Sequence, residues 1–153
     1  MTYEEMQQEY PAVNVVEMDL SEVKGLKGLC VDDNIAIRQD IRTQTEKSCV
    51  LAEELGHYHT TYGDILDLDN VQNRKQEFRA RMWGYNLKIG LLGIVRAYKK
   101  GCRNLSEMAE ELDVTEEYLL EALKAYRSKF GTCTTADGYV IYFDPALAVM
   151  KLY

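Results

Sequence analysis

The sequence predicts an α+β fold, with a small sheet near the N-terminus and a mostly helical middle. Short apolar runs at 13–18, 28–31 and 34–38 are typical of strands. From 43 to about 131, apolar residues recur at helical spacing instead. A chain of 153 residues is long enough to bury a hydrophobic core. We therefore expect a single α+β domain over 1–153.

The first elements follow from local signals. Thr2 and Glu5 form a capping box, which predicts a helix over 3–10. Asp32 and Asp33 separate the second and third apolar runs. A tight polar turn between two strand-like runs predicts a β-hairpin.

Helix signals dominate the middle of the chain. Thr43 opens a helix that is expected to reach about His57 and to be broken by the stretch 60–64. A second helix is predicted over 73–89, and a third ends at Gly101, because glycine commonly follows a helix C-terminus. The inward faces of the first two helices are expected to hold Cys49, Ala52, Leu55, Gly56, Phe78, Met82, Tyr85 and Ile89.

A helix pair is predicted over 104–131, within the same domain. Asn104 and Thr115 have side chains suited to cap the N-termini of its two helices. The stretches 132–135 and 139–143 alternate in a strand-like way around a short polar turn. They predict a pair of strands at the end of the sequence.

The composition argues against several classes of partner. The formal net charge of −7 opposes binding to nucleic acid and to anionic membranes. No stretch approaches the roughly 18 apolar residues of a membrane-spanning helix, and no basic region followed by an apolar run marks a secretory signal. The cysteines form no CxxC pair, which is typical of reduced thiols in a cytoplasm. They are Cys30, Cys49, Cys102 and Cys133. We expect a cytoplasmic protein.

The segment LAEELGHYHT, residues 51–60, contains both histidines of the chain. On a helix, Glu53 and His57 lie one turn apart on the same side, so both can bind one metal ion. Glu54 lies about 100° further round. This is the geometry of a His-Glu-x-x-His helix, in which two side chains bind the metal and the glutamate accepts a proton from water. The alternative is an exposed acidic helix that ends in histidine.

A third metal ligand is available on the next predicted helix. Catalytic zinc sites commonly use three protein ligands. Glu77 follows His57 after a loop, and Ala80, one turn beyond Glu77, is small enough for the two helices to approach closely. In the alternative interpretation, Glu77 is an exposed charge that pairs with Lys75 or Arg81.

Three segments, in this order, resemble the ImmA/IrrE family of metallopeptidases: LAEELGHYHTTYGDI, NRKQEFRARMW and LDVTEEYLLEALKAYRSKFG. The resemblance extends from about residue 26 to the end of the sequence. It is closest to short members associated with phages and mobile elements of Gram-positive bacteria. It implies a zincin-like fold, in which a small sheet packs beside an active-site helix and the following helix carries the third ligand.

The resemblance also implies roles for individual residues. Glu53, His57 and Glu77 would bind the metal, usually Zn²⁺, and Glu54 would act as the general base. His59 is an accessory candidate, which could approach the metal or stabilise an oxyanion if the helix ended near His57. The implied activity is that of a zinc-type metallo-endopeptidase encoded by a phage, a prophage or a mobile element. It would cleave a helix-turn-helix transcriptional repressor and so relieve repression.

Glu53 occupies the position at which the family usually has a histidine. Two carboxylates and one imidazole neutralise more of the charge of Zn²⁺, so the ion would be a weaker Lewis acid. Such a harder ligand set also tolerates Mn²⁺ or Fe²⁺. The substitution keeps an alternative open, namely a non-catalytic, antirepressor-like protein that binds a repressor on a zincin scaffold.

The helix pair at 104–131 suggests a further alternative, which is direct DNA binding through a helix-turn-helix. The second helix, however, would carry Glu116, Glu117 and Glu121 toward phosphates and base acceptors. We therefore expect this pair to pack within the domain or to dock the basic repressor, with no direct contact to nucleic acid.

Overall fold

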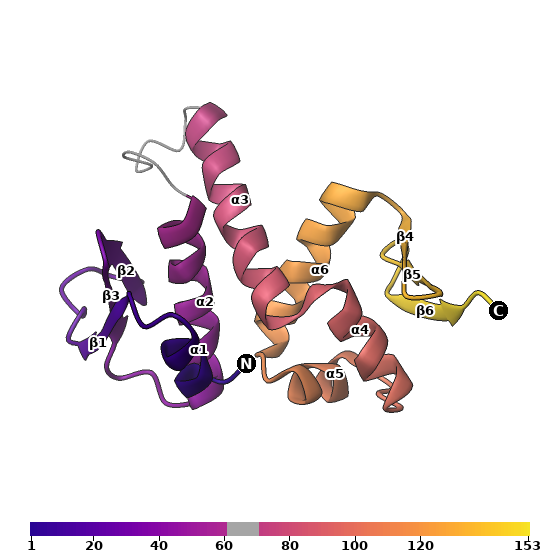
Figure 1. Ribbon diagram of the computed structural model, residues 1–153, viewed down its shortest axis with the longest axis horizontal. Coiled ribbons are helices and arrows are strands. Elements are labelled where there is room, and N and C mark those ends of the chain that lie inside the picture. The colour runs from indigo at the N-terminus through magenta and orange to yellow at the C-terminus, as the bar shows by residue number, and fades with distance from the viewer. Residues whose placement is uncertain (61–70) are drawn as a thin grey trace. The chain divides into compact units, whose positions relative to one another are not determined.

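The computed structural model describes residues 1–60 and 71–153 (Figure 1). Residues 61–64 of the predicted helix break lie outside this part of the chain. The chain forms two compact units, Met1–Leu87 and Lys88–Tyr153. Each unit combines helices with a three-stranded sheet, which confirms the α+β class; the single domain over the whole chain stays a prediction. Among the described residues, no helix is both long and apolar enough to cross a membrane.

The first unit begins with a helix and a small sheet. Its first elements are α1 (Tyr3–Glu9), β1 (Asn14–Met18), β2 (Gly28–Val31) and β3 (Asn34–Arg38). The capping box is confirmed, because Thr2 Oγ1 accepts the Glu5 N–H at 3.1 Å and Glu5 Oε2 accepts the Thr2 N–H at 2.8 Å. The strand order is β1-β3-β2, with β1 parallel to β3 and β2 antiparallel to it. The predicted hairpin is therefore confirmed, and β2 lies at an edge of the sheet.

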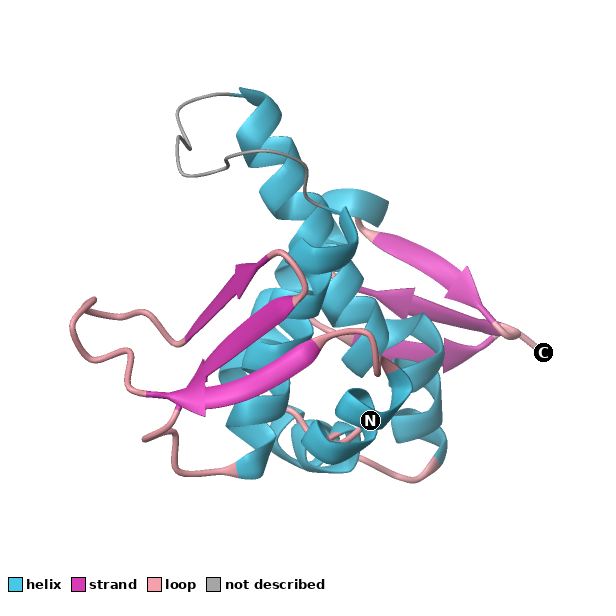
Figure 2. Cartoon of the chain, turned by 60° about the vertical axis from the view of Figure 1, so that its left-hand side comes forward, coloured by secondary structure: helices cyan, strands magenta, loops and turns pink. Residues whose placement is uncertain are grey.

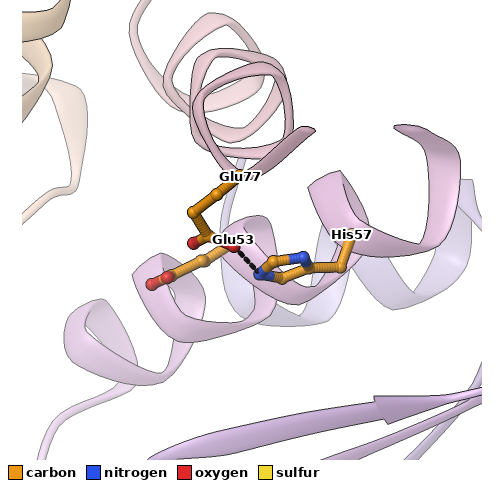
Figure 3. A group of neighbouring side chains, drawn as sticks. All are labelled: Glu53, His57 and Glu77. Atoms are coloured by element: carbon orange, nitrogen blue, oxygen red, sulfur yellow. Dashed lines mark ion pairs between the residues drawn. The ribbon is translucent and has the colours of Figure 1, made fainter. Parts of the chain in front are cut away.

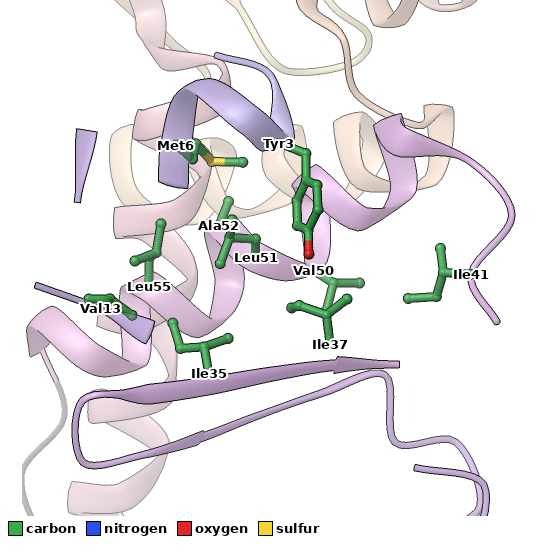
Figure 4. Packing of buried hydrophobic residues seen from close by; sticks show 10 residues of the cluster. All are labelled: Tyr3, Met6, Val13, Ile35, Ile37, Ile41, Val50, Leu51, Ala52 and Leu55. Carbon is green, nitrogen blue, oxygen red and sulfur yellow. The ribbon is translucent and has the colours of Figure 1, made fainter. Parts of the chain in front are cut away.

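Helix α2 (Gln44–Thr60) packs on this sheet, whose three strands lie side by side at the left of the view in Figure 2. Ile35 and Ile37 alternate along β3 and are fully buried with Leu51 and Leu55 of α2 (Figure 4). Burial of each such side chain contributes roughly 1.5–3 kcal/mol. This packing fixes one face of α2 against the sheet and leaves the opposite face available to the next helix.

Helix α3 (Val71–Lys88) corrects one part of the predicted core. Met82, Tyr85 and Ile89 are buried as expected, but Phe78 is 39% exposed. In the middle of α3, the inward face is instead set by Ala80, which is fully buried. Residues two positions apart on a helix are rotated by about 200° around its axis. Phe78 therefore points away from the face that carries Ala80.

The second unit contains three helices and a second sheet. Its elements are α4 (Gly90–Lys99), α5 (Leu105–Leu112), α6 (Glu116–Phe130), β4 (Cys133–Ala136), β5 (Tyr139–Tyr142) and β6 (Ala148–Lys151). Both predicted caps are confirmed. Asn104 Oδ1 accepts the Glu107 N–H at 2.8 Å, and Thr115 Oγ1 accepts the Tyr118 N–H at 3.1 Å.

The second sheet has the strand order β4-β5-β6, and all its pairs are antiparallel. The predicted strand pair is confirmed as β4 and β5. Strand β6 was not predicted from the sequence, because only Val149 of this strand is half-buried while Ala148, Met150 and Lys151 are exposed. A strand with so little buried surface leaves a weak periodic signal.

Candidate metal centre

Helix α2 places Glu53 and His57 one turn apart, and α3 brings Glu77 next to them (Figure 3). One ligand atom from each half-buried side chain lies within 4.8 Å of the other two. Nε2 of His57 is 3.5 Å from Oε2 of Glu77. In a tetrahedral zinc site, ligand atoms about 2.1 Å from the ion lie roughly 3.4 Å from one another. The three donors are of a type that binds divalent metals, and the separation of His57 and Glu77 is close to that of a metal site.

Glu77 divides its carboxylate oxygens between two partners. Oε2 faces His57, while Oε1 accepts from Nε of Arg81 at 3.1 Å. The pairing with Arg81 and the position beside His57 are thus both present, and each uses a different oxygen. A carboxylate held by a guanidinium has a fixed orientation, which is how neighbouring groups orient metal ligands.

The close approach of α3 to α2 depends on Gly56. A Cβ atom at this position would lie 2.0 Å from the backbone oxygen of Ala80 and 2.9 Å from its carbonyl carbon. No side chain fits in that space, so the two helices cross at backbone contact. Gly56 lies next to His57 and Ala80 lies one turn beyond Glu77, so this crossing sets the distance between the two candidate ligands.

Glu54 points from α2 toward the sheet, at the edge formed by β2. A Cβ atom at Gly28 would lie 2.9 Å from Glu54 Cγ and 3.2 Å from Oε1. Burial, together with the carboxylates of Glu53 and Glu77, raises the pKa of Glu54 to about 8. A bound cation would act in the opposite direction and favour the carboxylate form. The residue is therefore placed to hold or release a proton near neutral pH.

His59 lies in an aromatic cluster rather than in the metal group. Its ring stacks on Trp83 with centroids 4.4 Å apart, and it also meets Tyr10 at 5.1 Å and Tyr58 at 4.9 Å. Burial lowers the pKa of His59. The helix continues to Thr60, past the expected end near His57. The accessory role of His59 stays a prediction, and in this structure its ring helps to join α2 to α3.

The structure thus brings together Glu53, His57 and Glu77. Two close approaches were not predicted from the sequence: that of Gly28 to the Glu54 side chain, and that of Gly56 to the backbone of Ala80. An interior helix glycine is itself a signal, because it usually costs stability unless close packing requires it.

A comparison with models of protein families finds a match. The family model Peptidase_M78, described as the IrrE N-terminal-like domain, matches residues 8–124. The match includes all of α2 and α3, and with them the complete group of candidate ligands. A search of curated proteins and a search of solved structures each found no match.

Proposed function

This chain belongs to the Peptidase_M78 family, and we propose from that premise that it is an endopeptidase that cleaves a helix-turn-helix repressor. The family supports a metallopeptidase-type function. The observation that carries the proposal is the cluster of Glu53, His57 and Glu77 donors beside the buried Glu54. Cleavage of the repressor would relieve repression of a phage or mobile element.

Glu53, His57 and Glu77 would hold the metal, for which we propose Zn²⁺ with Mn²⁺ or Fe²⁺ as substitutes. When bound, the ion supplies Lewis acidity that polarises the scissile carbonyl. Glu54 accepts a proton as the oxygen of water forms a bond to the carbonyl carbon. It then passes this proton to the amine nitrogen as the C–N bond breaks.

The edge strand β2 is the proposed binding surface for the peptide. It lies at one end of the strand order, and its first residue, Gly28, lies against Glu54. An edge strand offers backbone donors and acceptors to an extended peptide, which can add to the sheet as a further strand. A peptide bound in this way would run past Glu54 with its backbone aligned to the sheet.

Removal of either of two metal ligands is the direct test of the site. His57→Ala and Glu77→Ala should each reduce the metal content of protein purified without chelator to a small fraction of the native value, because each removes one of three ligands. Added Zn²⁺ should then raise the melting temperature of the native protein but not of the variants.

The matched control is His59→Phe, which removes the other imidazole of the same helix but keeps an aromatic ring against Trp83. It should retain the native metal content, measured by elemental analysis. Native metal content in both His57→Ala and Glu77→Ala would show that the ligands are assigned wrongly. A metal-loaded native protein that cleaves none of a panel of purified repressors would favour the non-catalytic, repressor-binding alternative.

The acidic N-terminal part of α6 is the proposed docking site for the repressor, which is basic because it binds DNA. Reversing Glu116, Glu117 and Glu121 to lysine should weaken repressor binding about tenfold at low salt, mainly through a slower association rate. Stopped-flow association at two salt concentrations measures this effect.

A control variant makes the same change of net charge in the first unit, by replacing the exposed Glu4, Glu9 and Glu22 with lysine. Its association rate should fall far less, because steering depends on where the charges lie. An equal fall of the association rate in the two variants would contradict the proposal that α6 docks the repressor.

A further inference from the structure

The second unit contains an apolar groove that the peptidase chemistry does not use. Its volume is about 630 Å³, and it lies among the end of α4, the helices α5 and α6, and the stretch from 143 to 149. All its lining residues belong to the unit Lys88–Tyr153. We call it the α6 groove. Its apolar side chains include Tyr98, Leu105, Leu120, Leu123, Phe143 and Val149.

Apolar surface is left open to solvent in this groove. Leu120 is 45% exposed and Tyr98 is 42% exposed. Phe143, at the floor of the groove, is only 7% exposed. The floor is therefore packed, whereas the walls expose apolar side chains to solvent. A concave patch of this kind, with large apolar side chains at its surface, is typical of an interaction site.

The charges at the groove are the reverse of those of the chain as a whole. Arg103, Lys124 and Arg127 line it and are exposed, and no aspartate or glutamate is among the described residues that line it. Arg127 forms a salt bridge with Asp144 at 3.2 Å. On a protein with a net charge of −7, this positive rim marks a local site for an anionic partner.

The spacing along α6 defines the shape of that partner. Leu120, Leu123, Lys124 and Arg127 follow one another at the i, i+3, i+4 and i+7 positions of one helix face. These four residues of α6 span about 10 Å, which is two turns of helix. Grooves beside a helix commonly accept a second helix that inserts apolar side chains at the same intervals.

We propose that the α6 groove binds an amphipathic helix of a partner protein, in which aspartate or glutamate flanks an apolar stripe. The apolar floor selects the apolar side chains of the partner helix, and Arg103 and Lys124 select its acidic flanks, since Arg127 already pairs with Asp144. The phosphates of a nucleic acid would satisfy the cations but leave the apolar walls exposed. The proposal does not depend on metal or on peptidase activity, so binding and cleavage can fail independently.

The test uses the full chain and a fluorescent synthetic helix with leucine at i, i+3, i+4 and i+7 and glutamate at most other positions. We expect saturable binding by anisotropy, weakened about tenfold by Lys124→Glu and by Leu120→Asp. Leu92→Asp is the matched control, because Leu92 is 55% exposed and does not line the groove. It should bind as the native protein does. Circular dichroism should show that all variants are folded.

A charge swap provides the decisive comparison. A second peptide, with lysine in place of glutamate, should bind the native protein about tenfold more weakly and should regain affinity for Lys124→Glu. Equal binding of both peptides, or an unchanged affinity in Leu120→Asp, would overturn the proposal. A dimer of the native chain in sedimentation that Leu120→Asp abolishes would also overturn it, since the groove would then bind a second copy.

Discussion

Replacing Glu54 with glutamine should reduce repressor cleavage by a factor of roughly 10²–10⁴ while the metal content stays near the native value. Glutamine keeps the size of the side chain and its place against Gly28, but it cannot accept a proton. Glu54 is not one of the three grouped ligands, so the metal site should stay intact. Cleavage is measured on a gel with purified repressor, and metal content by elemental analysis.

Glu46→Gln is the control for this variant. It makes the same chemical change on the same helix, where Glu46 pairs with Lys27 at 3.0 Å and not with the metal group. Its cleavage rate should be close to native. Full activity in Glu54→Gln would contradict the assigned general base, whereas loss of metal in that variant would show that Glu54 is itself a ligand.

The raised pKa of Glu54 also makes a prediction for the metal-free protein. Because the carboxyl of the folded state binds its proton more tightly, its contribution to stability is complete below pH 4.5 and is lost as the pH rises to about 8. The metal-free native protein should therefore lose stability over this range relative to Glu54→Gln. Urea unfolding of the two proteins at several pH values, in the presence of chelator, measures the difference.

Replacing Gly56 with alanine should weaken metal binding although no candidate ligand is changed. The new Cβ atom would lie 2.0 Å from the oxygen of Ala80, so α3 must shift by about 1 Å or more to restore normal contact. Glu77 would shift with it. We expect a loss of 10- to 100-fold in metal affinity, as for other changes that reorient ligands. The free energy of unfolding should fall by about 1–3 kcal/mol, because overpacking outweighs the higher helix propensity of alanine.

Gly93→Ala is the control, because it also replaces a glycine within a helix. A Cβ atom there would meet only side-chain atoms, the nearest being Leu112 Cδ2 at 3.3 Å. A flexible leucine methyl can move by a few tenths of an ångström, so Gly93→Ala should keep native metal affinity. Calorimetric titration with Zn²⁺ compares the two variants. Native affinity in Gly56→Ala would show that the helix crossing does not position Glu77.

The grouping of Glu53, His57 and Glu77 could be predicted from sequence because spacing on a helix is a local property; their role as metal ligands stays a prediction. Glu53 and His57 needed only helical periodicity, and Glu77 needed the resemblance to place it beside them. Gly56 was assigned only to the buried face, since a glycine does not reveal which backbone will lie above it. The inward position of Phe78 was wrong for a related reason. Periodicity shows that a helix has an apolar face, but the neighbouring helix decides which residues it covers.

Binding of the peptide along β2, as proposed, would restrict which peptide bonds can be cleaved, because β2 lies at the edge of the sheet. An edge strand recognises the backbone of its partner, and a residue inside a helix has already used its own N–H and C=O groups. Most of a helix-turn-helix protein would therefore be resistant, whatever its side chains. The bond that is cut should lie in a segment between helices, or in one that unfolds for long enough to be bound as a strand. Substrate selection would then depend on the local unfolding free energy of the repressor, and any ligand that stabilises this segment would protect it from cleavage.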